Sequence, residues 1–100
     1  MEYLKTIDGD VCNITMQGKF TFADHGNFKD VIGAAKEEGV RQVSIDLSQV
    51  DFVDSAALGM LLLVRDEVKK GEKSLVLKSP QGQVKKMFEI SRFYELFDFV

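Results

Sequence analysis

The sequence predicts an α/β domain built on a mixed β-sheet, with its helices packed mainly against one face of that sheet. Two observations support this class. First, two β-like runs open the chain around Asp8-Gly9, a strong hairpin signal because glycine accepts a positive φ. Second, helical and strand-like patterns then alternate, which implies parallel strands joined by right-handed crossovers.

The opening strands are expected at residues 3–7 and 11–17, followed by a helix. Apolar residues at i, i+3, i+4 and i+7 make one face of this helix. They are Phe28, Val31, Ile32 and Ala35. Thr21 and Asp24 fit a capping box at its start, since the hydroxyl can accept a backbone N–H and the carboxylate can reach back. Gly39 is expected to end it.

Residues 41–47 form the next expected strand, in which apolar residues alternate toward one core face. After a loop, Ser55 opens a second helix that ends near Lys70. Because apolar residues fill most of its circumference as far as Val64, this helix is expected to be the most buried.

Residues 74–78 form a further strand, and Ser79-Pro80 begins a third helix with the serine as cap. The apolar segment 92–100 is expected to pack as a short turn and a final strand. The inward positions of these elements are expected to share one core: Phe28, Ile32, Val43, Ile45, Leu61, Leu62, Leu75, Leu77 and Phe88.

The composition suits one domain spanning residues 1–100, with 45% apolar content. The lone Cys12 allows no internal disulfide, which suits a reducing compartment, and its strand pattern indicates a buried thiol. The net charge of -3 is mixed along the chain and lacks the basic footprint of a nucleic-acid or membrane-surface binder. With no signal-peptide features and no apolar run long enough to span a bilayer, we expect a cytoplasmic protein without membrane insertion.

The sequence offers little support for catalysis. His25 is the only histidine and is expected to be exposed, so Ser55 has no evident base to activate it. Neither a nucleophile elbow nor a Walker-type glycine loop is present. We therefore expect no catalytic residue and no cofactor site.

Three aspartates near one strand end could hold Mg²⁺ through their carboxylates. Asp46 opposes the apolar alternation, however, and Asp51 lies in an expected loop, where acids are common. Together with Asp54 they are interpreted as ordinary strand-end and loop acids, and no metal site is predicted.

The pair Asp54-Ser55 has a simple local explanation. Serine is a favoured N-cap, worth about 1 kcal/mol, and an acid just outside the helix favours its positive end. On local physics alone, the pair is a helix cap.

A resemblance adds a second interpretation. The segment VSIDLSQVDFVDSAALGMLL resembles the signature of the STAS domain, and more closely that of bacterial anti-sigma-factor antagonists. Gly18-Lys19-Phe20 and SPQGQVKKMFEISRFYELFDFV resemble further parts of the family, so the resemblance covers nearly the whole chain. In the family the serine directly after the aspartate is phosphorylated, and this role carries onto Ser55.

The resemblance implies a partner-switching regulator and not an enzyme. A serine kinase of the anti-sigma type would bind the unphosphorylated chain and phosphorylate Ser55, and a metal-dependent serine phosphatase would reverse the step. Binding the kinase frees whatever it holds, commonly a sigma factor. The expected partner-binding residues are Thr21, Asp24, Phe52, Val53, Asp54, Ser55, Ala56 and Ala57.

Thr21 departs from the aspartate that many family members carry there, and Ala57 replaces a family glycine. The alternative is a constitutive structural subunit, since STAS domains also serve transporters, including lipid-export assemblies. A third reading, with Ser55 as a catalytic nucleophile, lacks a nearby base.

Overall fold

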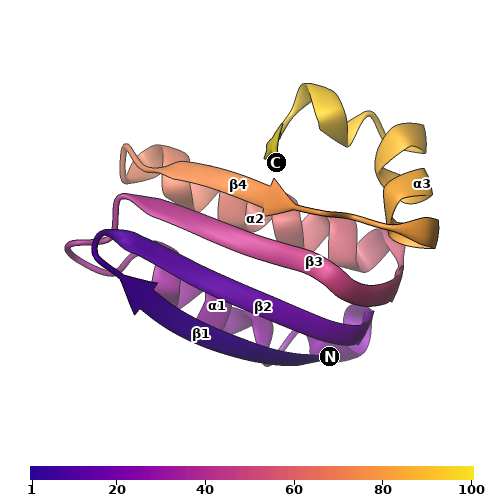
Figure 1. Ribbon diagram of the computed structural model, residues 1–100, viewed down its shortest axis with the longest axis horizontal. Coiled ribbons are helices and arrows are strands. Elements are labelled where there is room, and N and C mark those ends of the chain that lie inside the picture. Colours follow the sequence, from indigo (N-terminus) through magenta and orange to yellow (C-terminus); the bar gives the residue numbers. More distant parts are fainter.

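The computed structural model describes all residues from 1 to 100 and shows the predicted alternation of strands and helices (Figure 1). In chain order the elements are β1 (Glu2–Asp8), β2 (Val11–Phe20), the 3₁₀ turn η1 (Phe22–Asp24), α1 (Phe28–Ala35), β3 (Gln42–Val53), α2 (Ser55–Lys70), β4 (Ser74–Lys78), α3 (Gly82–Ile90), the 3₁₀ turn η2 (Phe93–Glu95) and β5 (Asp98–Phe99). The predicted α/β class is confirmed.

The five strands form one mixed sheet in the order β1-β2-β3-β4-β5. β1 runs antiparallel to β2, and all other neighbours are parallel. The β1–β2 hairpin closes with Asp8 opposite Val11, and Gly9 in its turn has a φ of 62°. Glycine enters this left-handed region at little steric cost, which is why the predicted hairpin forms here.

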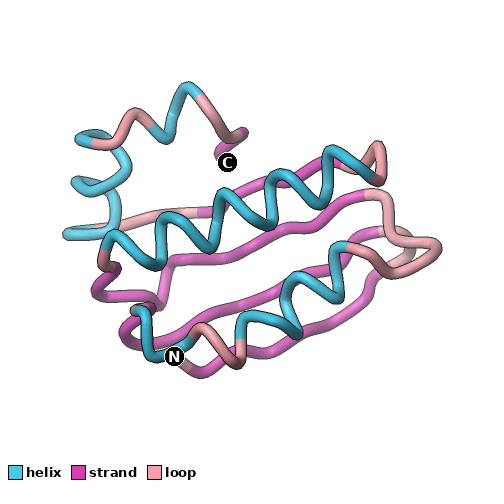
Figure 2. The backbone as a smooth tube through the Cα atoms, turned by 180° about the vertical axis from the view of Figure 1, so that it is seen from behind, coloured by secondary structure: helices cyan, strands magenta, loops and turns pink.

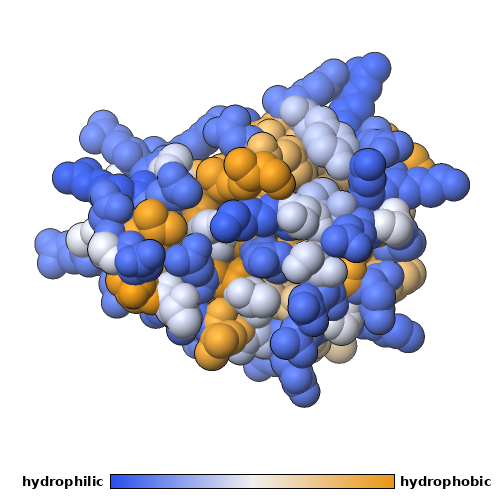
Figure 3. Space-filling view, viewed as in Figure 1, coloured by the Kyte–Doolittle hydropathy of each residue, from blue (hydrophilic) through white to orange (hydrophobic).

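Helices α1 and α2 lie side by side against one face of the sheet (Figure 2). α3 packs instead near the carboxyl end of β3, and η2 and β5 return toward β4. The opposite face of the sheet carries no helix, and apolar side chains appear there as separate patches among polar ones (Figure 3). No helix in the structure has the length and hydropathy that crossing a membrane requires.

The core lies between the sheet and the two helices. Seven of the nine predicted core residues are buried, and the exceptions, Ile32 and Leu62, are half-buried against the core. Each exception follows a buried residue in its helix, and the 100° step between neighbouring residues turns it toward solvent. Leu61 is fully buried, whereas Leu63 on the same helix is 50% exposed.

The first helix is shorter than predicted. The capping box of Thr21 and Asp24 does form, but it closes the single turn η1 and not the helix. An intervening glycine and asparagine, both poor helix formers, separate that turn from α1, which begins only at Phe28. α1 then ends at Ala35, and Gly39 lies in the following loop with a φ of 87°.

The third helix begins later than predicted. Ser79 has a φ of 52°, which lies outside the helical range, and its N–H donates to the carbonyl of Val100 beside β5. Ser79-Pro80 therefore precedes α3 and does not cap it. The N-cap is Gln81, and the helix starts at Gly82.

β3 is longer than the predicted strand and replaces the loop expected after residue 47. It reaches Val53, with register shifts against β2 between Thr15 and Gln17 and between Gly18 and Lys19. Such bulges insert extra residues and bend the strand. Only Asp54 separates the end of β3 from the start of α2.

We predict that two leucines of α2 differ sharply in their contribution to stability. Leu61→Ala should lower the free energy of unfolding by about 2–5 kcal/mol, because the buried side chain leaves a cavity. Leu63→Ala, the control, should cost less than about 0.5 kcal/mol because its side chain is half in solvent. Urea denaturation of both variants measures the difference, and similar losses would contradict the observed orientation of α2.

Candidate functional site

Ser55 is exposed at the first position of α2, but it does not cap that helix. The N-cap is Asp54, whose backbone is extended and whose Oδ1 accepts the N–H of Ala57 at 2.9 Å. The sequence-based assignment of the cap to Ser55 is therefore wrong. Because Asp54 performs the capping, the Ser55 hydroxyl is not needed to hold the helix.

The second oxygen of Asp54 reaches another part of the chain. Asp54 Oδ2 accepts the N–H of Phe22 at 3.1 Å, so one carboxylate joins the start of α2 to η1. The sequence indicated an acid favoured by the helix dipole, but it gave no sign of this bond. The result is a fixed position for η1 beside Ser55.

Thr21 and Asp24 shape η1 internally. Thr21 Oγ1 accepts the N–H of Ala23 at 3.3 Å, and Asp24 Oδ2 accepts the N–H of Thr21 at 2.9 Å. Asp24 is only 5% exposed, and its other oxygen pairs with the amino group of Met1. Asp24 is therefore a structural anchor, with both carboxylate oxygens engaged within the chain.

The same turn leaves an aromatic side chain in solvent. Phe22 is 69% exposed, and the imidazole of His25, which is exposed as predicted, stacks on it with ring centroids 6.1 Å apart. Phe22 was not among the residues predicted from the sequence. One signal was available in the sequence: Phe22 is a large apolar residue between the two capping residues, and it does not belong to the apolar periodicity that marks the core face of the helix.

Gln83, on α3, holds the end of β3 from the other side. Its Oε1 accepts the N–H of Val53 and its Nε2 donates to the carbonyl of Val53, both at 2.9 Å. A polar residue in a helix carries no sequence signal for such a contact, and Gln83 was also missed. Asp54 and Gln83 together attach the segment before Ser55 to η1 and to α3.

The predicted partner-binding residues thus divide into exposed and buried groups. Val53 and Ala57 are fully buried and Asp24 is 5% exposed, so these side chains lie beneath the surface around Ser55, and their role in partner binding stays a prediction. Phe52 is 38% exposed, Ser55 is exposed, and Thr21, Asp54 and Ala56 are half-buried.

Other candidate chemistry is not assembled at this site. Asp46 accepts the N–H of Ser48 at 2.9 Å, and both oxygens of Asp54 accept backbone N–H groups. Together with Asp51, these aspartates form no group that could hold a metal ion. Cys12 is fully buried, and burial raises the pKa of its thiol, which disfavours the nucleophilic thiolate.

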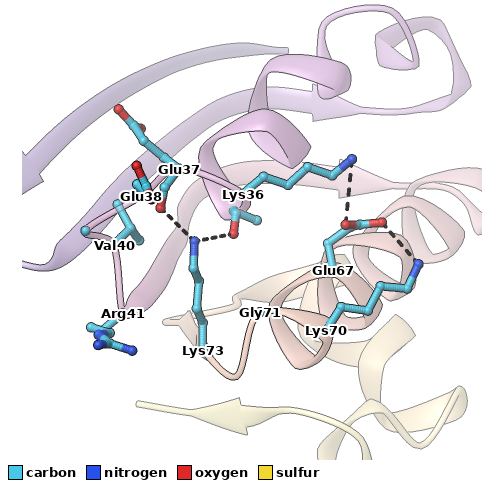
Figure 4. A pocket seen from close by; sticks show the side chains of 11 residues that line it. Lys36, Glu37, Glu38, Val40, Arg41, Glu67, Lys70, Gly71 and Lys73 are labelled. Atoms are coloured by element: carbon cyan, nitrogen blue, oxygen red, sulfur yellow. Dashed lines mark hydrogen bonds and ion pairs between the residues drawn. The ribbon is translucent and has the colours of Figure 1, made fainter.

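The largest hollow lies at the other end of the sheet, where the chain enters β3 and β4. It measures about 500 Å³ and is lined mostly by charged residues (Figure 4). Lys73 Nζ donates to the carbonyls of Ala35 at 2.8 Å and Glu37 at 2.7 Å, which closes the end of α1. Glu67 lies between Lys36 at 3.7 Å and Lys70 at 3.6 Å. We interpret the contacts of Lys73 and Glu67 that line this hollow as a structural clamp, which joins the end of α1 to α2 and to the loop before β4.

The geometry defines a small α/β domain that presents an exposed serine at a helix start, next to the aspartate that holds the turn carrying the exposed Phe22. Residues 4–98 match the family described as Mlab, STAS domain. A STAS-domain containing protein of Pseudomonas aeruginosa (strain UCBPP-PA14) is 36% identical over 94 residues, covering 94% of this chain and 92% of that protein. The chain belongs to the STAS domain family, as its resemblance to that family predicted.

A second relative and three solved structures are also similar. BtrV of Bordetella bronchiseptica, named as a candidate anti-sigma factor antagonist, is 32% identical over 82% of this chain and 71% of that protein. The anti-sigma factor antagonist SpoIIAA, unphosphorylated, aligns with a TM-score of 0.76 at 15% identity, over 99% of this chain and 87% of the other. Phosphorylated Bacillus SpoIIAA aligns with a TM-score of 0.75 at 16% identity, over 99% of this chain and 91% of the other. A sulfate transporter family protein of Wolinella succinogenes aligns with a TM-score of 0.79 at 18% identity, over 95% of this chain and 80% of the other. At these identities the structures show a shared fold.

We predict that Asp54 stabilises the fold through both oxygens. Asp54→Ala should lower the free energy of unfolding by about 1–3 kcal/mol, because it removes the cap of α2 and the charged acceptor of the Phe22 N–H. Asp54→Asn keeps one acceptor oxygen and should lose less. Asp51→Ala, at an exposed acid without hydrogen bonds, should change stability by less than about 0.5 kcal/mol. Equal urea midpoints for the Asp54 and Asp51 variants would contradict the bridging role.

We predict a comparable effect at the opposite end of the sheet. Lys73→Met preserves most of the aliphatic stem but leaves the carbonyls of Ala35 and Glu37 without their charged donor, at an expected cost of about 1–3 kcal/mol. Lys69→Met is the control, since the exposed side chain of this lysine makes no hydrogen bond or ion pair. Thermal melts compare the two, and a midpoint unchanged at Lys73 would show that the clamp adds nothing.

Proposed function

We propose that this chain is a single-domain, cytoplasmic partner-switching regulator, of the anti-sigma-factor antagonist type, controlled by reversible phosphorylation of Ser55. Its partners are a serine kinase that also acts as an anti-sigma factor, and a metal-dependent serine phosphatase. The chain is their substrate and binding module, not an enzyme. The observation that carries the proposal is that Ser55 is exposed at a helix start while Asp54 does the capping.

A phosphate at this position is compatible with the fold. The amides of Ser55 and Ala56, like the first donors of any α-helix, have no intrahelical acceptor, and the helix dipole favours negative charge there. Phosphorylation adds about 1.5–2 negative charges. With the side chain outside the core, that charge changes the surface and leaves the packing intact.

The proposed binding surface consists of the accessible residues around Ser55. Phe22 and Phe52 are exposed and provide apolar area, and Thr21, Asp54 and Ala56 are half-buried. A kinase covering this surface would meet the phosphate and the Asp54 carboxylate together. Like charges in an interface that excludes water are costly, so phosphorylation should release the partner.

The similarities support the proposal at the level of a class. BtrV is named as a candidate anti-sigma factor antagonist, and SpoIIAA has been solved in unphosphorylated and phosphorylated forms. The second candidate is a constitutive structural subunit of a transporter or other assembly, favoured by the shared fold with a sulfate transporter family protein.

Intact-mass measurement on the protein from its native cells, with and without phosphatase treatment, tests the proposal. We expect a fraction heavier by one phosphate, removed by the phosphatase and mapped to Ser55. A chain that remains unmodified under all growth conditions would favour the structural subunit.

We predict different consequences for two replacements of Ser55. Because Asp54 is the cap, Ser55→Ala should cost less than about 0.5 kcal/mol and leave binding intact. Ser55→Asp should also remain folded, since its charge lies at the favourable helix end, but should bind the partner more weakly. The loss should be partial, because one planar charge imitates phosphate imperfectly.

Titration calorimetry against the kinase that copurifies with the chain measures both affinities, with melting curves in parallel. If both folded variants bind like the wild type, charge at residue 55 does not control the interface. The constitutive subunit would then be the better account.

A further inference from the structure

β3 extends well beyond its neighbour β4. β4 pairs only with residues 42–46 of β3, whereas β3 continues to Val53. On the β4 side, the last residues of β3 therefore lack a strand partner. A backbone N–H or C=O left unpaired at a buried position is costly, so this edge requires another source of hydrogen bonds.

The side chain of Gln83 supplies that source. Its amide group accepts from the N–H of Val53 and donates to the carbonyl of the same residue, each at 2.9 Å. A glutamine amide carries one acceptor and one donor group in the arrangement of a peptide unit. Gln83 thus takes the place of the missing strand, and the side chain of Val53 is fully buried beside it.

Val53 is separated from Ser55 by Asp54 alone. Asp54 in turn is fixed by the N–H groups of Ala57 and Phe22. The segment before the serine is therefore attached to α3 through Gln83, to α2 through the cap, and to η1 through Phe22. Removing the α3 attachment frees one end of this series of contacts.

We propose that Gln83 is a positioning residue that couples α3 to the segment 53–57 and so sets the geometry of the Ser55 hydroxyl. This inference rests on the proposed function, because the geometry matters where a kinase must align the hydroxyl with its phosphate donor. Alignment contributes to the chemical step, whereas the exposed residues around Ser55 contribute to binding. Gln83 therefore acts on kcat and leaves KM nearly unchanged.

The first experiment needs no partner and compares Gln83→Met with Gln81→Met by amide hydrogen exchange. Gln81 is exposed and makes no side-chain cap bond, so it is a matched control two residues away. In Gln83→Met, the amide of Val53 should exchange about tenfold faster because it loses its hydrogen bond to Gln83. The amide of Phe22 should also exchange faster, because the loosened segment no longer fixes its acceptor, Asp54. The amide of Ile45, deep in β3, should be unchanged, and the control should match the wild type.

The second experiment measures phosphorylation by the copurifying kinase. Gln83→Met should lower kcat about tenfold while KM stays within about twofold, as expected for lost alignment with retained binding. Gln83→Glu keeps the length of the side chain and an acceptor for the N–H of Val53 but loses the donor. Its kcat should therefore lie between those of the wild type and Gln83→Met. This variant also serves if Gln83→Met fails to fold.

The outcomes separate this inference from the proposed function. Faster exchange at Val53 alone, with Phe22 unchanged, would show that Gln83 has only a local role and would overturn the coupling. An unchanged kcat would overturn the positioning role while leaving Ser55 as the phosphorylation site. A wild-type chain that no kinase phosphorylates would refute the proposed function and the kinetic role, but the exchange data would still decide whether Gln83 orders the segment.

Discussion

The carboxylate of Asp54 is the interaction on which the site depends. Its two oxygens accept the N–H groups of Ala57 and Phe22, which belong to elements far apart in the sequence. A serine hydroxyl at the same place could cap the helix but has a single oxygen for both bonds. An asparagine would offer one acceptor and one donor group. Only a carboxylate accepts in both directions, and this requirement explains why the acid caps α2 and leaves Ser55 free.

The parallel part of the sheet separates structural and surface roles. The Ser55 segment follows the carboxyl end of β3, whereas Lys73 and the clamp around Glu67 lie where the chain enters β3 and β4. The clamp uses charged groups to satisfy carbonyls and to join helices. The Ser55 end uses Asp54 and Gln83 on backbone groups and leaves Phe22 and Phe52 in solvent. A substitution at one end should therefore affect stability without altering the exposed surface at the other.

The apolar periodicities predicted the strands and helices well, because residues that face the core recur at the period of the element they belong to. The alternation of β3 and the apolar circumference of α2 identified Ile45 and Leu61 as core residues. Local hydrogen-bonding signals were less decisive. The sequence predicts the capping box of Thr21 and Asp24, but a short-range pattern cannot tell whether a turn continues as a helix.

Contacts between side chains and distant backbone groups left no sequence signal. Phe22 and Asp54 are 32 residues apart, and Val53 and Gln83 are 30 apart. Neither bond requires a special residue period or a special composition. The motif around Ser55 therefore indicates a candidate site, while the residues that fix its geometry became visible only in the fold.

The same contacts bear on how a switch at Ser55 would operate. No hydrogen bond that holds η1, the end of β3 or the start of α2 uses the Ser55 side chain, so modifying it removes no support from the fold. Under the proposed function, phosphate would act through the charge it adds to the surface beside Phe22 and Phe52, without a conformational change carried through the core. Because the segment is already attached to α3, α2 and η1, a partner would lose little binding energy in ordering it. The affinity would then depend mainly on complementarity at the surface, which is the property that one added phosphate changes most.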